Sequence, residues 1–109
     1  MTRSDRERLD DIADAVRAIR AHVARSRSDE RLRRDAILYN LVIVGEAVKG
    51  LAEETKAKRP EVPWRQISGL RDLLTHEYFR IDMEEVTKIV DRDLSALEKA
   101  VGALRRTAD

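Results

Sequence analysis

The chain has 109 residues, of which 39% are charged, and its 22 lysines and arginines nearly balance 21 aspartates and glutamates, giving a formal net charge of +1. It has no cysteine, which excludes a disulfide framework, a thiol nucleophile and a thiolate metal site. No apolar run approaches the roughly 18 residues of a transmembrane helix, and the charged start is unlike a secretory signal. We therefore expect a single cytoplasmic domain over residues 1–109 with no membrane partner.

The first predicted helix runs from Ser4 to Val23. Ser4 and Glu7 have the S-x-x-E spacing of a capping box. An apolar stripe follows at helical spacing, formed by Leu9, Ile12, Ala13, Val16, Ile19 and Val23. His22 lies late in this helix among arginines, and we interpret it as a surface histidine. The pattern ends at polar residues 26–29, a connector of the length expected between antiparallel helices.

A second helix is predicted from Asp29, which can cap it, to about residue 51. From Tyr39 to Val44 it is apolar on nearly every face, which indicates burial on two sides, in the core or in a partner interface. Glu46 is the charged residue of this apolar stretch, and a buried carboxylate needs a partner. Arg71 is one candidate for that partner, while an interface or solvent would serve equally.

The middle section begins after two prolines, Pro60 and Pro63, which prevent a regular helix there. Trp64 then starts a short helical turn, and Ser68 opens a further short helix over residues 70–76. We interpret Trp64 as a packing anchor in preference to a platform for base stacking.

The last helix is predicted to follow a turn at residues 78–81 and to begin at Asp82 and Glu85, again at capping-box spacing. Its apolar stripe continues to the C-terminus through Val86, Ile89, Val90, Leu94, Leu97, Val101 and Leu104. No strand pattern of period two occurs. The predicted fold is an all-α antiparallel helical bundle with two long N-terminal helices, a short middle helix and a long C-terminal helix.

Arg71 and His76 are the candidate catalytic residues of the middle section. Five positions of a regular helix place them about 140° apart around the axis, so they share a face only if the helix ends near Thr75. Arginine offers a bidentate fork to phosphoryl oxygens, and histidine transfers protons near neutral pH. On RNA, the base would activate the ribose 2′-OH to attack the adjacent phosphate, with no metal or cofactor. The spacing alone is a weak signal, and taken by itself we interpret it as a helix C-terminus stabilised by a cationic side chain in preference to a catalytic pair.

Residues 45–97 resemble the HEPN family, and within it the branch of HepT-like toxins. The match is carried, in order and in spacing, by Gly45-Glu46-Ala47, Pro60-Glu61-Val62-Pro63-Trp64, Gly69-Leu70-Arg71-Asp72, His76-Glu77-Tyr78-Phe79 and Ile81-Asp82. The early helices fit the same bundle. The sequence departs from many members at Asp72, where they carry Asn. This anionic neighbour would hold Arg71 by charge and could raise the pKa of a nearby histidine.

The resemblance implies a metal-independent endoribonuclease that acts as a toxin, with RNA as its substrate. It implies a homodimer whose cleft combines both chains, with Arg71 binding the scissile phosphate, His76 as general acid and base, and Asp72 as its orienting neighbour. It also implies an MntA-like nucleotidyltransferase antitoxin that transfers AMP to Tyr78, where the bulky anion would fill the cleft and repel RNA. Tyr78 could instead pack its ring at the bundle edge and hydrogen-bond through its hydroxyl.

Two further questions stay open at this level. An arginine cluster is formed by Arg17, Arg20, Arg25, Arg27, Arg31, Arg33 and Arg34. It could guide RNA, serve an acidic partner protein or form a solvated tip. The alternative function is a non-catalytic module that binds nucleotide or substrate beside a minimal nucleotidyltransferase, with Arg71 and His76 only binding phosphate.

Overall fold

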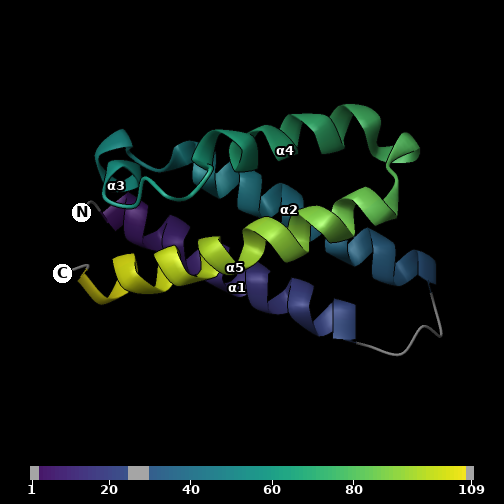
Figure 1. Ribbon diagram of the computed structural model, residues 1–109, viewed down its shortest axis with the longest axis horizontal. Helices are drawn as coiled ribbons and strands as arrows, with labels where there is room; N and C mark the ends of the chain where they lie inside the picture. The colour runs from purple at the N-terminus through teal and green to yellow at the C-terminus, as the bar shows by residue number, and fades with distance from the viewer. Residues whose placement is uncertain (1–2, 25–29, 108–109) are drawn as a thin grey trace.

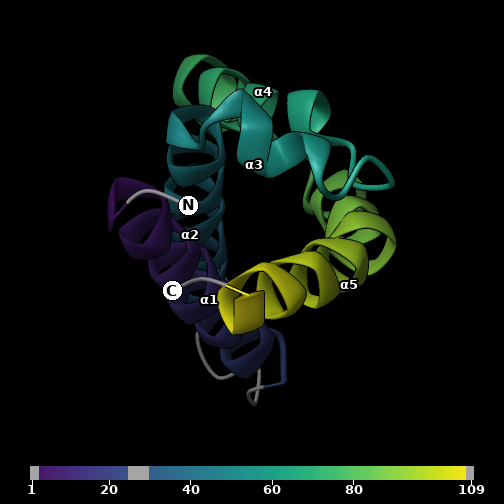
Figure 2. The ribbon, with the colours of Figure 1, turned by 90° about the vertical axis from the view of Figure 1, so that its left-hand side faces the viewer.

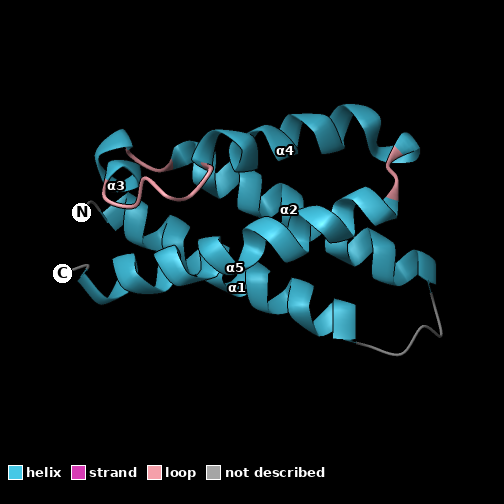
Figure 3. Cartoon of the chain, in the orientation of Figure 1, coloured by secondary structure: helices cyan, strands magenta, loops and turns pink. Residues whose placement is uncertain are grey.

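The computed structural model describes residues 3–24 and 30–107. Its elements are α1 (Arg3–Ala24), α2 (Glu30–Gly50), α3 (Glu53–Ala57), α4 (Trp64–Glu77), the 3-10 helix η1 (Tyr78–Arg80) and α5 (Met83–Thr107). No strand occurs in these described ranges (Figure 3), so the predicted all-α helical bundle is confirmed. The predicted connector at residues 26–29, with its cap at Asp29, lies outside the described residues.

The four long helices run antiparallel to their neighbours (Figure 1). α1 packs against α2, α2 against α4, and α5 against α1, so α2 lies between α1 and α4 when the bundle is viewed from its end (Figure 2). Each contributes an apolar stripe to the core, because its apolar residues recur at helical spacing. The most buried side chains include Leu9, Ile12, Ile19, Leu38, Val48 and Leu97. None of the described helices has the length and apolar character that a bilayer crossing requires.

The two predicted helix caps at the ends of the bundle differ in outcome. At α5, Oδ1 of Asp82 accepts a hydrogen bond from the backbone N–H of Glu84 at 2.9 Å, so Asp82 caps the helix as expected. At α1, the helix already includes Arg3, and the predicted cap at Ser4 is wrong. The Ser4 hydroxyl lies within the first turn and accepts a hydrogen bond from Nη1 of Arg8 at 2.8 Å.

The middle of the chain forms one helix of 14 residues, where the sequence predicted a turn followed by a separate short helix. Ser68 caps no new helix, because its hydroxyl donates to the carbonyl of Arg65 at 3.0 Å. Packing of α4 on α2 supplies the stability that local propensity at this point lacks. Since α4 extends to Glu77, Arg71 and His76 stay about 140° apart. The shared face considered for one chain is therefore not formed.

Residues 53–57 form the short helix α3, which the sequence pattern did not predict. A contact with α1 fixes its start. The buried carboxylate of Asp5 accepts hydrogen bonds from the backbone N–H of Ala52, at 3.1 Å, and from the hydroxyl of Thr55. The predicted apolar periodicity of α1 gave no sign of this polar contact.

Trp64 anchors the loop between α3 and α4 through two hydrogen bonds. Its indole N–H donates to the carbonyl oxygens of Lys56, at 3.1 Å, and Arg59, at 2.9 Å. The ring is half-buried against the core. These contacts agree with the interpretation of Trp64 as a packing anchor.

Within one chain, α2 buries one side fully and the other only in part. Ile37, Leu41 and Val44 are buried, whereas Tyr39 is 66% exposed and Val42 is half-buried. The burial on two sides that the sequence predicted is therefore not completed inside a single chain.

Candidate active site

The candidate site lies where α4 packs against α2 at Gly45. A Cβ atom added there would lie 3.0 Å from both Cβ and the backbone N of Arg71, and 3.2 Å from the carbonyl oxygen of Ile67. Glycine therefore lets the backbone of α4 approach α2 at the residue that carries the candidate guanidinium. The next residue of α2, Glu46, can then reach that guanidinium.

Two carboxylates hold Arg71. Its Nε lies 2.8 Å from Oε2 of Glu46, and its Nη1 lies 3.2 Å from Oδ1 of Asp72. The Arg71 side chain is 40% exposed, so a ligand from solvent can still reach it. Glu46 is itself exposed. Of the partners considered for Glu46, the structure shows Arg71 and leaves the carboxylate open to solvent as well.

His76 lies five residues further along α4 and is exposed. Over the described ranges, its side chain makes no hydrogen bond or ion pair. Asp72, predicted to orient His76, is four residues away and on the same helix face, but its ion pair is with Arg71. The histidine is thus presented to solvent with both ring nitrogens available, while the arginine is fixed.

Tyr78 connects the end of α4 to α2 through hydrogen bonds. Its hydroxyl donates to Oδ1 of Asp35 at 2.6 Å, and its carbonyl accepts from Nη2 of Arg34 at 2.7 Å. The Arg34 guanidinium also lies over the tyrosine ring, 5.1 Å from its centroid. The ring packing and the hydroxyl hydrogen bond, which were considered as the alternative role of Tyr78, are present, and modification of Tyr78 stays a prediction.

The same contact changes the acidity of the phenol. Asp35 raises the pKa of the Tyr78 hydroxyl above its ordinary value of 10.0 because it accepts the hydrogen bond of the neutral form; partial burial and the negative charge of Asp35 act in the same direction. The positive charges of Arg34 and Arg31 oppose the shift. Tyr78 is therefore a neutral hydrogen-bond donor at neutral pH.

Sequence reasoning missed Asp35, and it placed Arg34 only in the arginine cluster. Both residues lie more than 40 positions before Tyr78, so no local spacing connects them. Gly45, in contrast, left a signal, because a glycine inside an apolar helix lowers helix propensity and needs a packing reason.

The arginine cluster is in part a network of contacts within the chain. Its members with partners are Arg17 with Asp14, Arg20 with Glu98, Arg33 with the carbonyl of His22, and Arg34 with Asp35 and the carbonyl of Tyr78. His22 itself is half-buried, more than a surface histidine would be. Arg25 and Arg27 lie outside the described residues.

An all-α bundle that fixes an arginine and presents a histidine on one helix carries the groups that phosphodiester chemistry uses. A family model described as ribonuclease HepT-like matches residues 7–104. The chain therefore belongs to the HepT-like ribonuclease family, as the sequence resemblance predicted.

Similar proteins agree with this family. The chain is 33% identical to a probable ribonuclease HepT of Thermococcus cleftensis, over 97% of this chain and 100% of that protein. It is 41% identical to a putative RNase of Caldanaerobacter subterraneus, over 61% of this chain and 59% of that protein. It is also 37% identical to a putative RNase of Methanocaldococcus jannaschii, over 67% of each. No solved structure matches the chain significantly.

Proposed function

We propose that this protein is an endoribonuclease in which Arg71 binds the scissile phosphate and His76 transfers the proton. One observation carries the assignment: the guanidinium of Arg71 is held between two carboxylates yet remains 40% exposed. A charged donor stabilises the charge that develops in a phosphoryl transition state most effectively when the donor is already oriented before the reaction begins. Glu46 and Asp72 are the positioning residues of this arginine.

The reaction needs no group outside the protein and the RNA. A histidine base takes the proton of the ribose 2′-OH, and the 2′-oxygen bonds to the adjacent phosphorus. The bond from phosphorus to the 5′-oxygen breaks, and a histidine acid protonates that oxygen. The products are a 2′,3′-cyclic phosphate and a free 5′-hydroxyl.

The geometry of α4 favours a homodimer as the active form. Arg71 and His76 of one chain point about 140° apart, so the histidine beside a bound phosphate is more readily supplied by a second chain. Exposed apolar side chains lie on the same helices, with Tyr39 66% and Leu73 51% exposed. A two-fold contact that covers them would complete the apolar burial predicted for α2.

The decisive experiment compares RNA cleavage by the purified protein with cleavage by His76→Ala and Arg71→Ala. Loss of cleavage in both variants, with folding unchanged by circular dichroism, is the expected result. Equal cleavage by wild type and His76→Ala would remove His76 from the mechanism. An inactive wild type that still binds RNA would favour the non-catalytic binding module instead.

We further propose that the protein is the toxin of a toxin–antitoxin pair and that an MntA-like nucleotidyltransferase neutralises it by transferring AMP to Tyr78. The support is the position of Tyr78, which lies two residues after His76 and is half-buried where α4 ends. An added nucleotide would replace the hydroxyl proton that Tyr78 donates in its hydrogen bond to Asp35, and it would bring a negative charge beside that carboxylate.

The test of this step is the intact mass of the protein after co-expression with a nucleotidyltransferase encoded next to it. Mass increments of AMP on wild type and none on Tyr78→Phe are expected. Growth inhibition by the protein alone, relieved by that neighbour, is the matching result in cells. An unchanged mass of the wild-type protein would contradict the modification.

A further inference from the structure

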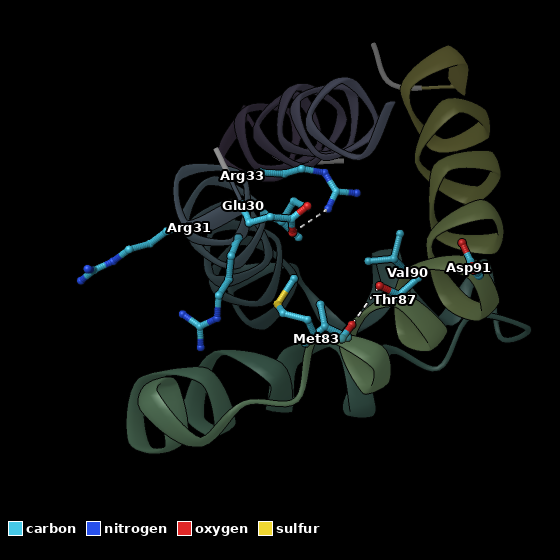
Figure 4. Close-up of a pocket in the computed structure, with 10 residues that line it drawn as sticks. Glu30, Arg31, Arg33, Met83, Thr87, Val90 and Asp91 are labelled. Atoms are coloured by element: carbon cyan, nitrogen blue, oxygen red, sulfur yellow. Dashed lines mark hydrogen bonds and ion pairs between the residues drawn. The ribbon is translucent and has the colours of Figure 1, made fainter. Parts of the chain in front are cut away.

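A cavity lies apart from Arg71 and His76, between the first half of α2 and the first half of α5 (Figure 4). Its volume is about 310 Å³, at the lower end of the range of small-molecule sites. The floor is apolar and is formed by Ile37, Met83, Val86 and Val90. Such a floor can cover one face of a flat aromatic ring.

The rim of this cavity is rich in arginine. In Figure 4, Glu30 and Arg33 of α2 lie opposite Met83 and Thr87 of α5, while Arg31 extends away from the cavity. Arg33 and Arg34 also line it. An arginine at such a rim can bind a negatively charged group of a ligand through its guanidinium.

Arg34 is the arginine best placed to bind an anion here. Its contacts with the Tyr78 carbonyl, at 2.7 Å, and with Asp35, at 3.4 Å, fix the guanidinium in place. A guanidinium has five N–H donors, so these two contacts leave donors for a ligand. The held orientation lowers the entropy cost of binding a phosphate.

Two carboxylates, Glu30 and Asp91, share the wall of the cavity with Arg33 and Arg34, and Glu30 pairs with Arg33 at 4.0 Å. Carboxylates accept hydrogen bonds from hydroxyl and amino groups, whereas they repel phosphate. A ligand that fits this wall therefore combines an anionic group, an apolar flat ring and hydrogen-bond donors.

We propose that the cavity between α2 and α5 binds a nucleoside phosphate, with the base on the apolar floor and the phosphate on Arg34. The ligand is either a free nucleotide or one nucleotide of an RNA chain, since both present the same groups. The RNA form rests on the proposed ribonuclease function. Arg34 and Glu46 are about 18 Å apart along α2 at 1.5 Å per residue, so such an RNA would extend well beyond the scissile phosphate.

The test uses the His76→Ala protein, to prevent cleavage, with two probes: free AMP, followed by amide NMR shifts, and a short fluorescent oligoadenylate, followed by anisotropy. Thr87→Asp adds a carboxylate at an exposed position of the wall, and Arg34→Gln removes the phosphate contact. Each should weaken binding about tenfold, as loss or opposition of one charge-assisted contact does. Arg34→Gln should also reduce the salt dependence of oligoadenylate binding: the slope of the logarithm of the binding constant against the logarithm of the salt concentration should fall by roughly one.

Arg92→Gln is the matched control, because it removes a positive charge from α5 at an exposed residue outside the cavity. It should leave the binding of both probes unchanged. Saturation by AMP alone would identify a free nucleotide, and saturation by the oligonucleotide alone would identify RNA. Absence of binding by both probes, or unweakened binding to a folded Thr87→Asp protein, would overturn the proposal.

Both readouts are binding and do not depend on cleavage. If the catalytic assignment fails, the cavity can still be shown to bind AMP, and if the cavity fails, the assay of His76→Ala against wild type stands unaffected.

Discussion

The orientation of the Arg71 side chain depends on Glu46 and Asp72, whose ion pairs with it add little to the free energy of folding. Exposed ion pairs of the kind it forms with Glu46 and Asp72 stabilise a protein by only about 0–1 kcal/mol. Their effect on the direction of the guanidinium is larger, because two carboxylates from two helices restrict it. The role we assign to Glu46 is therefore one of positioning, and it can be separated from stability.

We expect Glu46→Gln to lower RNA cleavage about tenfold, as the loss of one charge-assisted contact to a reacting group does. The melting temperature should hardly change, and the loss should appear in kcat more than in KM. Glu61→Gln is the control, because Glu61 also pairs with an arginine, Arg59, at 2.9 Å but lies in the loop before α4. Equal loss in both variants would remove the positioning role.

The hydrogen bond between Tyr78 and Asp35 predicts a pH effect. Because the folded chain raises the pKa of Tyr78, it favours the neutral phenol. This contribution to stability is present below about pH 10, the pKa of an unfolded tyrosine, and is lost as the pH rises through the higher folded pKa. In a Tyr39→Phe protein, which has Tyr78 as its one tyrosine, absorbance at alkaline pH reports this titration.

Asp35→Asn should shift that titration to lower pH, towards the ordinary tyrosine value. A midpoint that stays in place after this substitution would show that Asp35 does not control the phenol.

At the scale of helices, the close contact between α2 and α4 requires a glycine at position 45 but not at position 69. A Cβ atom added at Gly45 would lie 3.0 Å from both the backbone N and the Cβ of Arg71, whereas a Cβ atom added at Gly69 would have no such neighbour within 4 Å. Both lie inside helices, where glycine costs about 1 kcal/mol relative to alanine. The two positions therefore separate helix propensity from close packing.

Gly45→Ala should destabilise the protein by about 1–3 kcal/mol, because the backbone of α4 cannot move aside as a flexible side chain can. Gly69→Ala should stabilise it by up to about 1 kcal/mol. Urea unfolding of both variants measures the two effects. A neutral or stabilising Gly45→Ala would mean that α4 does not approach α2 as described.

At the scale of the whole molecule, the single chain leaves apolar surface near the candidate site. Phe79, which follows Tyr78 at the end of α4, is 94% exposed, and Tyr39 on α2 is 66% exposed. Burial of such rings contributes strongly to protein–protein contacts. The proposed homodimer would cover them.

Phe79→Glu should shift a dimer to monomer in size-exclusion chromatography with light scattering. The substitution should change the stability of the single chain by less than about 0.5 kcal/mol, since the side chain is exposed. Gln66→Glu adds the same charge at an exposed position near the start of α4 and should leave the dimer intact. A wild-type protein that is monomeric at all concentrations would contradict the dimer.

Local patterns in the sequence determined the helices and the candidate residues of α4. The apolar stripes of α1, α2 and α5 repeat at helical spacing, and Arg71, His76 and Tyr78 lie within eight residues of one another. Such features depend on neighbours along the chain, which a sequence displays directly. The helix break predicted at Ser68 was wrong because packing of α4 on α2 outweighs the weak local preference against a helix at this point.

Only the tertiary structure decided which residues hold these candidates in place. Glu46 reaches Arg71 across 25 positions, Asp35 reaches Tyr78 across 43, and Asp5 reaches Thr55 across 50. No spacing rule applies at such separations, because the partners meet only after α2 has packed between α1 and α4. The sequence therefore determined which groups could act on a phosphate, and the packing of the helices decided which of them are fixed and which are open to solvent.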